Sequence, residues 1–111
     1  MESAITYSDR DNSFTITFKK NGTVLDENEM GAITKIELKF DDKYYDSETY
    51  STAFVRDDAE GQVKVNPYEF GMAAGEDLDS EIIVYDEGYY QNGLVWDKFK
   101  WRHSGEAEVA G

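Results

Sequence analysis

Pairs of acidic residues are the first feature of this sequence that could carry chemistry. Two carboxylates that converge can bind a hard cation or act together as a general acid and base. Each pair also falls at an expected turn, where Asp is favoured because its side chain bonds the local backbone. A turn role is therefore favoured, and a cation site remains the alternative. The pairs are Asp41/Asp42, Asp57/Asp58, Glu76/Asp77/Asp79 and Asp86/Glu87.

The segment 26–37 partly fits the ligand spacing of a calcium-binding loop. Asp26 and Glu37 stand at its first and twelfth positions, and Gly31 stands at its sixth. Met30 occupies the fifth position, where an oxygen ligand is required, and both flanks have strand patterns instead of helical ones. The sequence therefore predicts no calcium site here, and we expect no metal and no other cofactor.

His103 is the sole histidine, and the chain has no cysteine. Ser-His-Asp chemistry would depend on this one imidazole, and no serine or carboxylate can be tied to it by spacing. The residue follows the last expected strand among polar neighbours, so we expect a histidine on the surface. No catalytic residue is assigned, and the sequence predicts a protein that is not an enzyme.

The charge of the chain limits its partners. It has 24 acidic and 11 basic residues, which give a formal net charge of -13. This excess of carboxylates repels phosphates and disfavours direct binding to nucleic acid. Acidic loops keep a β protein soluble, and the alternative is that they imitate the phosphates of a nucleic acid. No apolar run approaches the ~20 residues that span a bilayer, and the first residues do not fit a signal peptide, so no membrane partner is expected.

Aromatic and basic residues supply the candidate interface. Tyrosines in expected loops suit contacts with a protein or a sugar, although they can also cap the ends of a small sandwich. Basic residues alternate along the last expected strand. This suits docking onto acidic loops of a neighbouring copy, or protection of an edge strand. The candidate residues are Tyr44, Tyr45, Tyr89, Tyr90, Lys98, Lys100 and Arg102.

Hydrophobic periodicity predicts the strands that would position these residues. The most apolar stretch, 81–102, has the pattern of two strands joined by a turn-rich middle, with Tyr89 and Tyr90 at its tip. Either Trp96 or Trp101 is expected in the core. Asn21-Gly22 is the strongest two-residue signal for a hairpin. Further strands are expected at 5–7, 13–19, 23–25, 34–40, 52–55 and 62–66, with Thr34, Ile36, Leu38 and Phe40 on one face.

Two segments are expected outside the strands. The polar segment 26–31 has the composition of a loop. The segment 68–78 is short and contains Gly71 and Gly75, which weaken a helix, so we expect a turn or a single 3₁₀ turn there. Pro67 lacks an N–H and is expected to end the strand before it.

These elements predict one all-β domain. About seven short strands, separated by turn signals roughly every 8–12 residues, favour an immunoglobulin-like antiparallel β-sandwich. The domain is expected to span 1–104. The segment 105–111 has little to bury and is expected to form a C-terminal tail.

The order of these segments resembles a known family. A strand and an Asn21-Gly22 turn are followed by ITKIELKF, then by FVRDDAEGQVKV, and finally by EIIVYDEGYYQNGLVW. This order is similar to that of the small immunoglobulin-like modules of tailed-bacteriophage virion proteins, of the baseplate upper, fibre-associated or head-decorating type. The Cys–Trp–Cys signature of antibody domains is absent.

The resemblance implies a structural protein of the virion, assembled in the host cytoplasm. Its partners would be other virion proteins or copies of itself, and such modules carry no catalytic residues. Two other functions remain open on the residues alone. One is an acidic inhibitor that imitates nucleic acid as a phage counter-defence protein. The other is a carbohydrate-binding module that uses Tyr89, Tyr90 and a nearby tryptophan.

Overall fold

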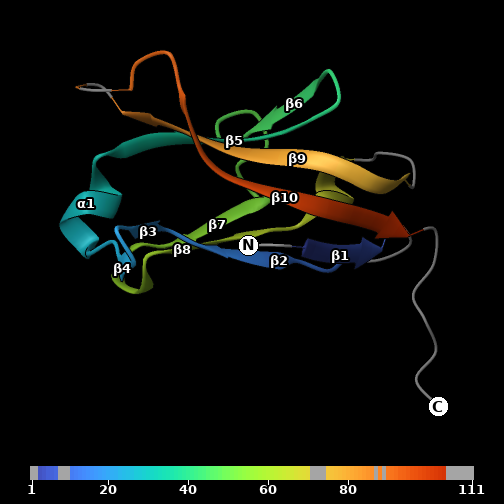
Figure 1. The fold of residues 1–111 in the computed structure, drawn as a ribbon, viewed down its shortest axis with the longest axis horizontal. Helices are drawn as coiled ribbons and strands as arrows, with labels where there is room; N and C mark the ends of the chain where they lie inside the picture. Colours follow the sequence, from blue (N-terminus) through green and yellow to red (C-terminus); the bar gives the residue numbers. More distant parts are fainter. Residues whose placement is uncertain (1–2, 8–10, 71–74, 87, 89, 105–111) are drawn as a thin grey trace.

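The structure is a computed structural model that describes residues 3–7, 11–70, 75–86, 88 and 90–104. The described part contains ten strands, one α-helix and two 3₁₀ helices (Figure 1). The expected C-terminal tail, 105–111, lies outside the described residues. The strands are β1 (Ser3–Tyr7), β2 (Phe14–Thr17), β3 (Lys19–Lys20), β4 (Thr23–Val24), β5 (Ile33–Phe40), β6 (Lys43–Asp46), β7 (Phe54–Asp57), β8 (Gln62–Val65), β9 (Gly75–Asp86) and β10 (Leu94–Ser104). The helices are α1 (Glu27–Gly31), η1 (Asp58–Glu60) and η2 (Pro67–Phe70).

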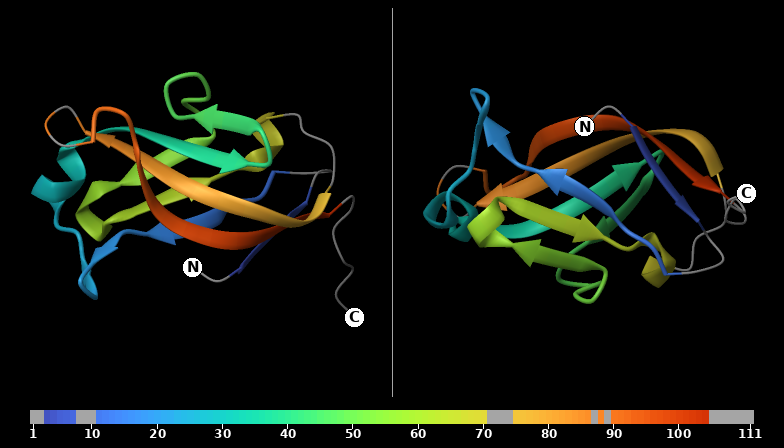
Figure 2. Two further views of the ribbon diagram at one scale, coloured as in Figure 1. Left: turned by 45° about the horizontal axis from the view of Figure 1, so that its top comes forward. Right: turned by 90° about the horizontal axis from the view of Figure 1, so that it is seen from below.

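Two sheets form the body of the molecule, which confirms the expected all-β class. One has the order β1-β10-β9-β5-β6 and the other has the order β2-β8-β7, while β3 and β4 form a separate hairpin. The two sheets form two layers (Figure 2). The hydrophobic core contains buried residues of both sheets, among them Ile16 and Val84. All pairs are antiparallel except β1 with β10, which run parallel. The count of about seven short strands was too low, and β9 and β10 are long, with 12 and 11 residues.

The β9–β10 hairpin lies at the centre of the larger sheet. β9 pairs with β10 on one side and with β5 on the other. The strand begins at Gly75, earlier than the start expected at Glu81. The pairing of Trp101 with Leu78 and of His103 with Gly75 extends the ladder to this point. The expected 3₁₀ turn is present as η2, and 71–74 lie outside the described residues.

Alternation along the strands builds the core. Trp101 is fully buried, with its ring centre 5.0 Å from that of Phe40 and 5.9 Å from that of Phe14. Ile36, Leu38 and Phe40 of β5 point inward as expected, but Thr34 is exposed. An irregularity in the β5–β9 register between Ile33 and Lys35 places Ile33 inward instead.

The chain reverses at Asn21-Gly22 as expected. Both residues have positive φ, 53° and 80°, which a two-residue turn between twisted strands requires. The expected polar loop at 26–31 is instead the helix α1. Asp26 accepts a hydrogen bond from the Glu29 N–H, and the Glu29 side chain accepts one from the Asp26 N–H. This reciprocal capping box stabilises the start of the helix.

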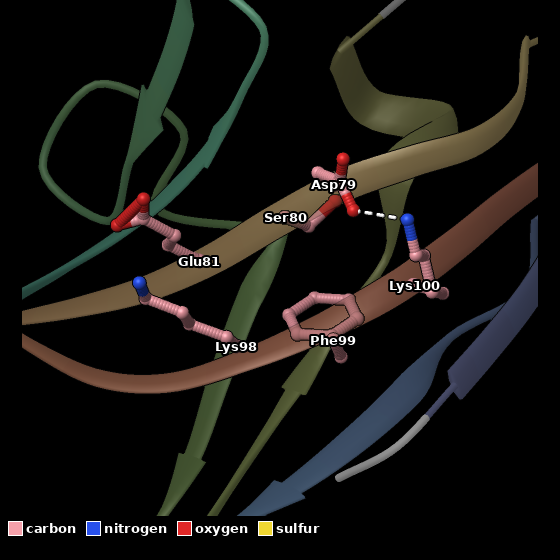
Figure 3. A pocket seen from close by; sticks show the side chains of 6 residues that line it. All are labelled: Asp79, Ser80, Glu81, Lys98, Phe99 and Lys100. Carbon is pink, nitrogen blue, oxygen red and sulfur yellow. Dashed lines mark hydrogen bonds and ion pairs between the residues drawn. The ribbon is translucent and has the colours of Figure 1, made fainter.

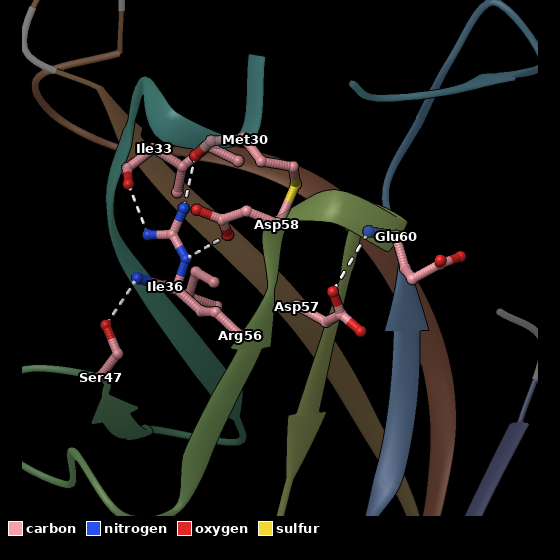
Figure 4. A network of polar contacts seen from close by, with 8 residues as sticks. All are labelled: Met30, Ile33, Ile36, Ser47, Arg56, Asp57, Asp58 and Glu60. Carbon is pink, nitrogen blue, oxygen red and sulfur yellow. Dashed lines mark hydrogen bonds and ion pairs between the residues drawn. The ribbon is translucent and has the colours of Figure 1, made fainter. Parts of the chain in front are cut away.

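Arg56 of β7 joins α1 to the smaller sheet (Figure 4). Its guanidinium donates to the carbonyl oxygen of Ile33 at 2.6 Å and to that of Met30. Its Nε donates to Asp58 Oδ1 at 3.0 Å. These carbonyls lie where α1 ends and β5 begins, where the helix leaves backbone acceptors without partners in the helix. The side chain therefore fixes the position of α1 against β7.

Candidate protein interface

One face of the larger sheet points away from the core, and we call it the outer face. It is set by strand alternation, because residues paired across β10, β9, β5 and β6 point to the same side. Asp79, Glu81, Lys98 and Lys100 line a depression of about 430 Å³ on it, together with Ser80 and Phe99 (Figure 3). The outer face comprises Lys35, Glu37, Lys39, Tyr44, Asp46, Asp79, Glu81, Ile83, Tyr85, Val95, Lys98, Lys100 and Arg102.

Side chains in the middle of the outer face bind one another. Lys100 pairs with Asp79, and Lys39 Nζ lies 3.9 Å from Glu81 Oε1. Tyr85 donates its hydroxyl to Glu37 Oε1 at 2.9 Å. Burial, then the hydrogen bond and the charge of Glu37, raise the pKa of Tyr85 to about 12. The hydrogen-bond donor of Glu37 therefore comes from β9, the neighbouring strand.

The three basic residues predicted for the interface lie on the outer face, and we call them the basic stripe: Lys98, Lys100 and Arg102. All three are exposed on β10. Lys98 is opposite Glu81, whose carboxylate pairs with Lys39. No hydrogen bond or ion pair joins Lys98 to another side chain among the described residues, so its ammonium group is available to a partner.

Basic charge is concentrated on the outer face. Lys35, Lys39 and the basic stripe supply five of the 11 basic residues of the chain. Of the acidic residues whose side chains the structure describes, only four lie there, namely Glu37, Asp46, Asp79 and Glu81. Among these described residues the acidic excess therefore lies elsewhere, and the face differs in charge from the rest of the described surface.

The predicted tyrosines lie in different places. Tyr44 is 55% exposed on the outer face, with Lys39 Nζ 5.7 Å from its ring centre. Tyr45 points the other way and stacks on Phe70, with ring centres 4.3 Å apart. Tyr45 is therefore mainly a packing residue, because neighbours on a strand face opposite sides. Tyr89 lies outside the described residues.

Tyr90 lines a second cavity, of about 220 Å³, which we call the end pocket because it lies at the α1 end of the molecule. Trp96 forms another part of its wall and contacts Phe18 edge-on at 5.9 Å between ring centres. The sequence placed a tryptophan near the tyrosine pair without specifying the pocket. The other lining residues are Lys20, Leu25, Glu29, Ala32, Ile33, Val84 and Asp86.

His103 is fully buried, so the prediction of a surface histidine was wrong. Its Nδ1 lies 2.8 Å from Thr6 Oγ1, and this hydroxyl accepts a hydrogen bond from Trp101 Nε1 at 2.8 Å. The parallel pairing of β1 with β10 brings Thr6 beside His103. The Nε2 atom is buried without a hydrogen-bond partner among the described residues. The hydrogen bonds among Thr6, Trp101 and His103 join β1 to β10. Thr6 and His103 are 97 positions apart, so no local pattern indicates this contact.

This burial predicts a pH-dependent stability. Desolvation lowers the pKa of His103, whereas the unfolded chain should titrate near the usual value of about 6.5. Below about pH 6.5 the unfolded state binds more protons, so the free energy of unfolding falls as pH falls. Urea unfolding of the wild type and of His103→Gln between about pH 7.5 and about pH 5.5 tests this, because the variant has no histidine. Equal pH dependence of the two proteins would contradict the prediction.

Several acidic side chains have local structural partners. Asp57 Oδ1 accepts from the Glu60 N–H, which caps η1 as Asp26 caps α1. The pKa of Asp46 is lowered overall. Partial burial raises it, but hydrogen bonds from the Thr49 and Glu48 N–H groups, together with the positive charge of Lys35, outweigh this effect. Turn chemistry accounts for Asp57, as the sequence predicted, and also for Asp46. Asp79 lies within β9, so the expectation of a turn was wrong for this residue. Among the described residues, no group of three or more His, Cys, Asp or Glu side chains could hold a metal ion.

Imitation of a nucleic acid would need acidic residues that lie together, and two of the acidic groups, Asp57/Asp58 and Glu76/Asp77, lie apart. Asp57 and Asp58 lie beside η1, which contacts α1. Glu76 and Asp77 lie at the start of β9, whose opposite end, Asp86, pairs with Ile33 next to α1. A strand of 12 residues spans roughly 40 Å. The two pairs are therefore near opposite ends of the sheet.

Comparison with protein families and with curated proteins finds no match to this chain. Within the described residues, no helix is long and apolar enough to cross a membrane.

Proposed function

We propose that this chain is a non-enzymatic, immunoglobulin-like structural module of a bacteriophage virion. It acts by docking onto other virion proteins or onto other copies of itself, after synthesis in the host cytoplasm. The observation that carries the docking proposal is the outer face. There, five basic residues and the exposed Tyr44 lie together on a chain with a net charge of -13.

The strand order supports the immunoglobulin-like assignment. In a variable-type domain, one sheet contains strands G, F, C and C′, and the other contains B, E and D. The order β10-β9-β5-β6 opposite β2-β8-β7 corresponds to this arrangement. The chain departs from the antibody pattern in its core, where Trp101 comes from β10 and no cysteine is present.

The chemistry of the outer face supports docking. Tyrosine and arginine are enriched at protein interfaces, and complementary charges steer partners into register. Two ion pairs, Lys100 with Asp79 and Lys39 with Glu81, hold the side chains in the middle of the outer face in place. An acidic partner surface would then meet preorganised basic groups, which lowers the entropy cost of association.

Mass spectrometry of purified particles, combined with chemical cross-linking, tests the virion assignment. We expect peptides of this chain at stoichiometric levels, with cross-links from the lysines of the outer face to a neighbour. Presence in infected cells together with absence from particles would contradict the assignment.

Charge reversal of the basic stripe tests the docking face. We expect Lys98→Glu/Lys100→Glu/Arg102→Glu to weaken docking by at least about tenfold, because attraction to an acidic partner becomes repulsion. Rising salt should weaken docking of the wild type in the same direction. The measurement is incorporation into particles, or sedimentation with the cross-linked neighbour.

The matched control is Lys19→Glu/Lys43→Glu/Lys64→Glu. It makes the same change in net charge at three exposed lysines outside the outer face. If this control weakens docking as strongly as reversal of the stripe, total charge governs docking and the outer face does not.

A further inference from the structure

We propose that the end pocket receives a basic side chain from the basic stripe of a second copy, so that copies join head to tail. This inference rests on the proposed docking function and specifies the partner as another molecule of this chain.

The lining of the end pocket suits a long basic side chain. Leu25, Ala32, Ile33 and Val84 provide apolar surface for an aliphatic stem. The volume of about 220 Å³ lies below the ~300–1,000 Å³ of sites for drug-sized ligands. A pocket of this size accommodates one side chain better than a cofactor.

The polar groups of the pocket favour a cation. Trp96 and Tyr90 present aromatic rings, and aromatic faces attract Lys and Arg head groups. Glu29 and Asp86 add carboxylates, while Lys20 is the basic residue of the lining. Asp26 and Glu27, exposed at the start of α1, increase the acidic excess beside the pocket. The sum of these charges is negative, which attracts a basic partner and repels an acidic one.

The basic stripe is the matching surface on another copy. Lys98 is exposed and lies opposite Glu81 on the neighbouring strand (Figure 3). Glu81 pairs with Lys39. Lys98 thus presents an ammonium group that no described side chain binds. A flexible lysine on a regular strand can extend from the sheet into a concave site on a neighbour.

The stripe cannot fill the pocket of its own chain. Trp96 packs against Phe18 on the core side of the sheet, whereas Lys98 points away from the core. The sheet backbone therefore separates them. A contact between two different surfaces is heterologous, and such contacts produce rings or open filaments instead of closed two-fold dimers.

The decisive experiment mixes two variants that are each defective in one surface. The stripe variant is Lys98→Glu/Lys100→Glu/Arg102→Glu. The pocket variant is Glu29→Gln/Asp86→Asn, which keeps a hydrogen-bonding group at both positions, including the capping position of Glu29. We expect sedimentation to show assemblies for the wild type and monomers for each variant alone. An equimolar mixture should form dimers and nothing larger, because each pair has one intact stripe facing one intact pocket.

Several results would overturn the inference. A mixture that remains monomeric, or a pocket variant that assembles as the wild type does, excludes the contact. The control Asp42→Asn/Glu48→Gln removes two exposed carboxylates elsewhere and should assemble normally. A wild type that is monomeric but is bound to another virion protein through the stripe refutes this inference and leaves the proposed function intact. Quenching of the Trp96 fluorescence by a neutral glycan, with no self-assembly, would identify the pocket as a sugar site instead.

A second readout tests proximity directly. Because the chain has no cysteine, a Val95→Cys variant mixed with an Asn28→Cys variant carries one thiol on each copy and keeps Lys98 and Glu29. Under air oxidation, we expect mixed disulfide dimers to form at least about tenfold faster than with Lys64→Cys in place of Val95→Cys, since docking raises the local thiol concentration. Equal rates would contradict the proposed contact.

Discussion

Replacing Trp101 with alanine should lower the free energy of unfolding by about 3–5 kcal/mol. The indole is fully buried against Phe40 and Phe14, so its removal leaves a cavity between the sheets. It also removes the hydrogen bond to Thr6 Oγ1, which belongs to the group that joins β1 to β10. The total free energy of unfolding of a small domain is about 5–15 kcal/mol. The loss at Trp101 should therefore shift the midpoint of urea unfolding strongly.

Trp96→Ala is the matched control for this prediction. Trp96 is only partly buried and contacts the core from the side, so the same substitution should cost clearly less. If Trp101→Ala does not fold, Trp101→Phe provides the measurement, because it keeps an aromatic ring and loses only the donor to Thr6 and part of the volume. An equal cost at both tryptophans would contradict the assignment of Trp101 to the centre of the core.

The two tryptophans also show what a local pattern can and cannot predict. Phe99 and Trp101 alternate correctly with the exposed Lys98 and Lys100, so their inward direction follows from a period of two. Trp96 is out of phase with Phe99, yet it contacts Phe18 on the core side. A register shift between Val95 and Asp97 accounts for this, and such bulges have no reliable signal in one sequence.

Long-range contacts explain the other differences. His103 has polar neighbours in sequence, and only the parallel pairing of β1 with β10 encloses it. Arg56 was not a candidate residue, because its acceptors Met30 and Ile33 are more than 20 positions away. The helix α1, by contrast, had a local signal that was not used. Asp26 and Glu29 have the spacing of a capping box.

The candidate interface was partly predictable. Alternation along β10 correctly predicted that Lys98, Lys100 and Arg102 share an exposed face. Their partners depend on the register between β9 and β10, which places Asp79 beside Lys100. The sequence brought Tyr90 and a tryptophan together but did not indicate the end pocket, because its walls come from separate segments of the chain.

Replacing Arg56 with methionine should lower the free energy of unfolding by about 2–3 kcal/mol. Methionine keeps a long apolar stem but leaves the carbonyl oxygens of Met30 and Ile33 without their charged donor. Arg56→Lys should lower the free energy of unfolding by less, because the ammonium group keeps the positive charge. Some loss should remain, because an ammonium group cannot reach several acceptors in one plane as a guanidinium does. The neighbouring Lys64→Met, at an exposed position of β8, should change stability by no more than about 0.5 kcal/mol.

Hydrogen exchange separates this explanation from a general loss of stability. The Met30 N–H donates to the Asp26 carbonyl oxygen within α1. If Arg56 fixes α1 against β7, exchange at this amide should accelerate in Arg56→Met more than exchange in the β9–β10 ladder. Uniform acceleration across both elements would show that Arg56 stabilises the whole domain without specifically positioning α1.

Because Glu29 of α1 lines the end pocket, a selective effect on α1 should also weaken the head-to-tail contact. The stability of this helix would then control the shape of the proposed binding site.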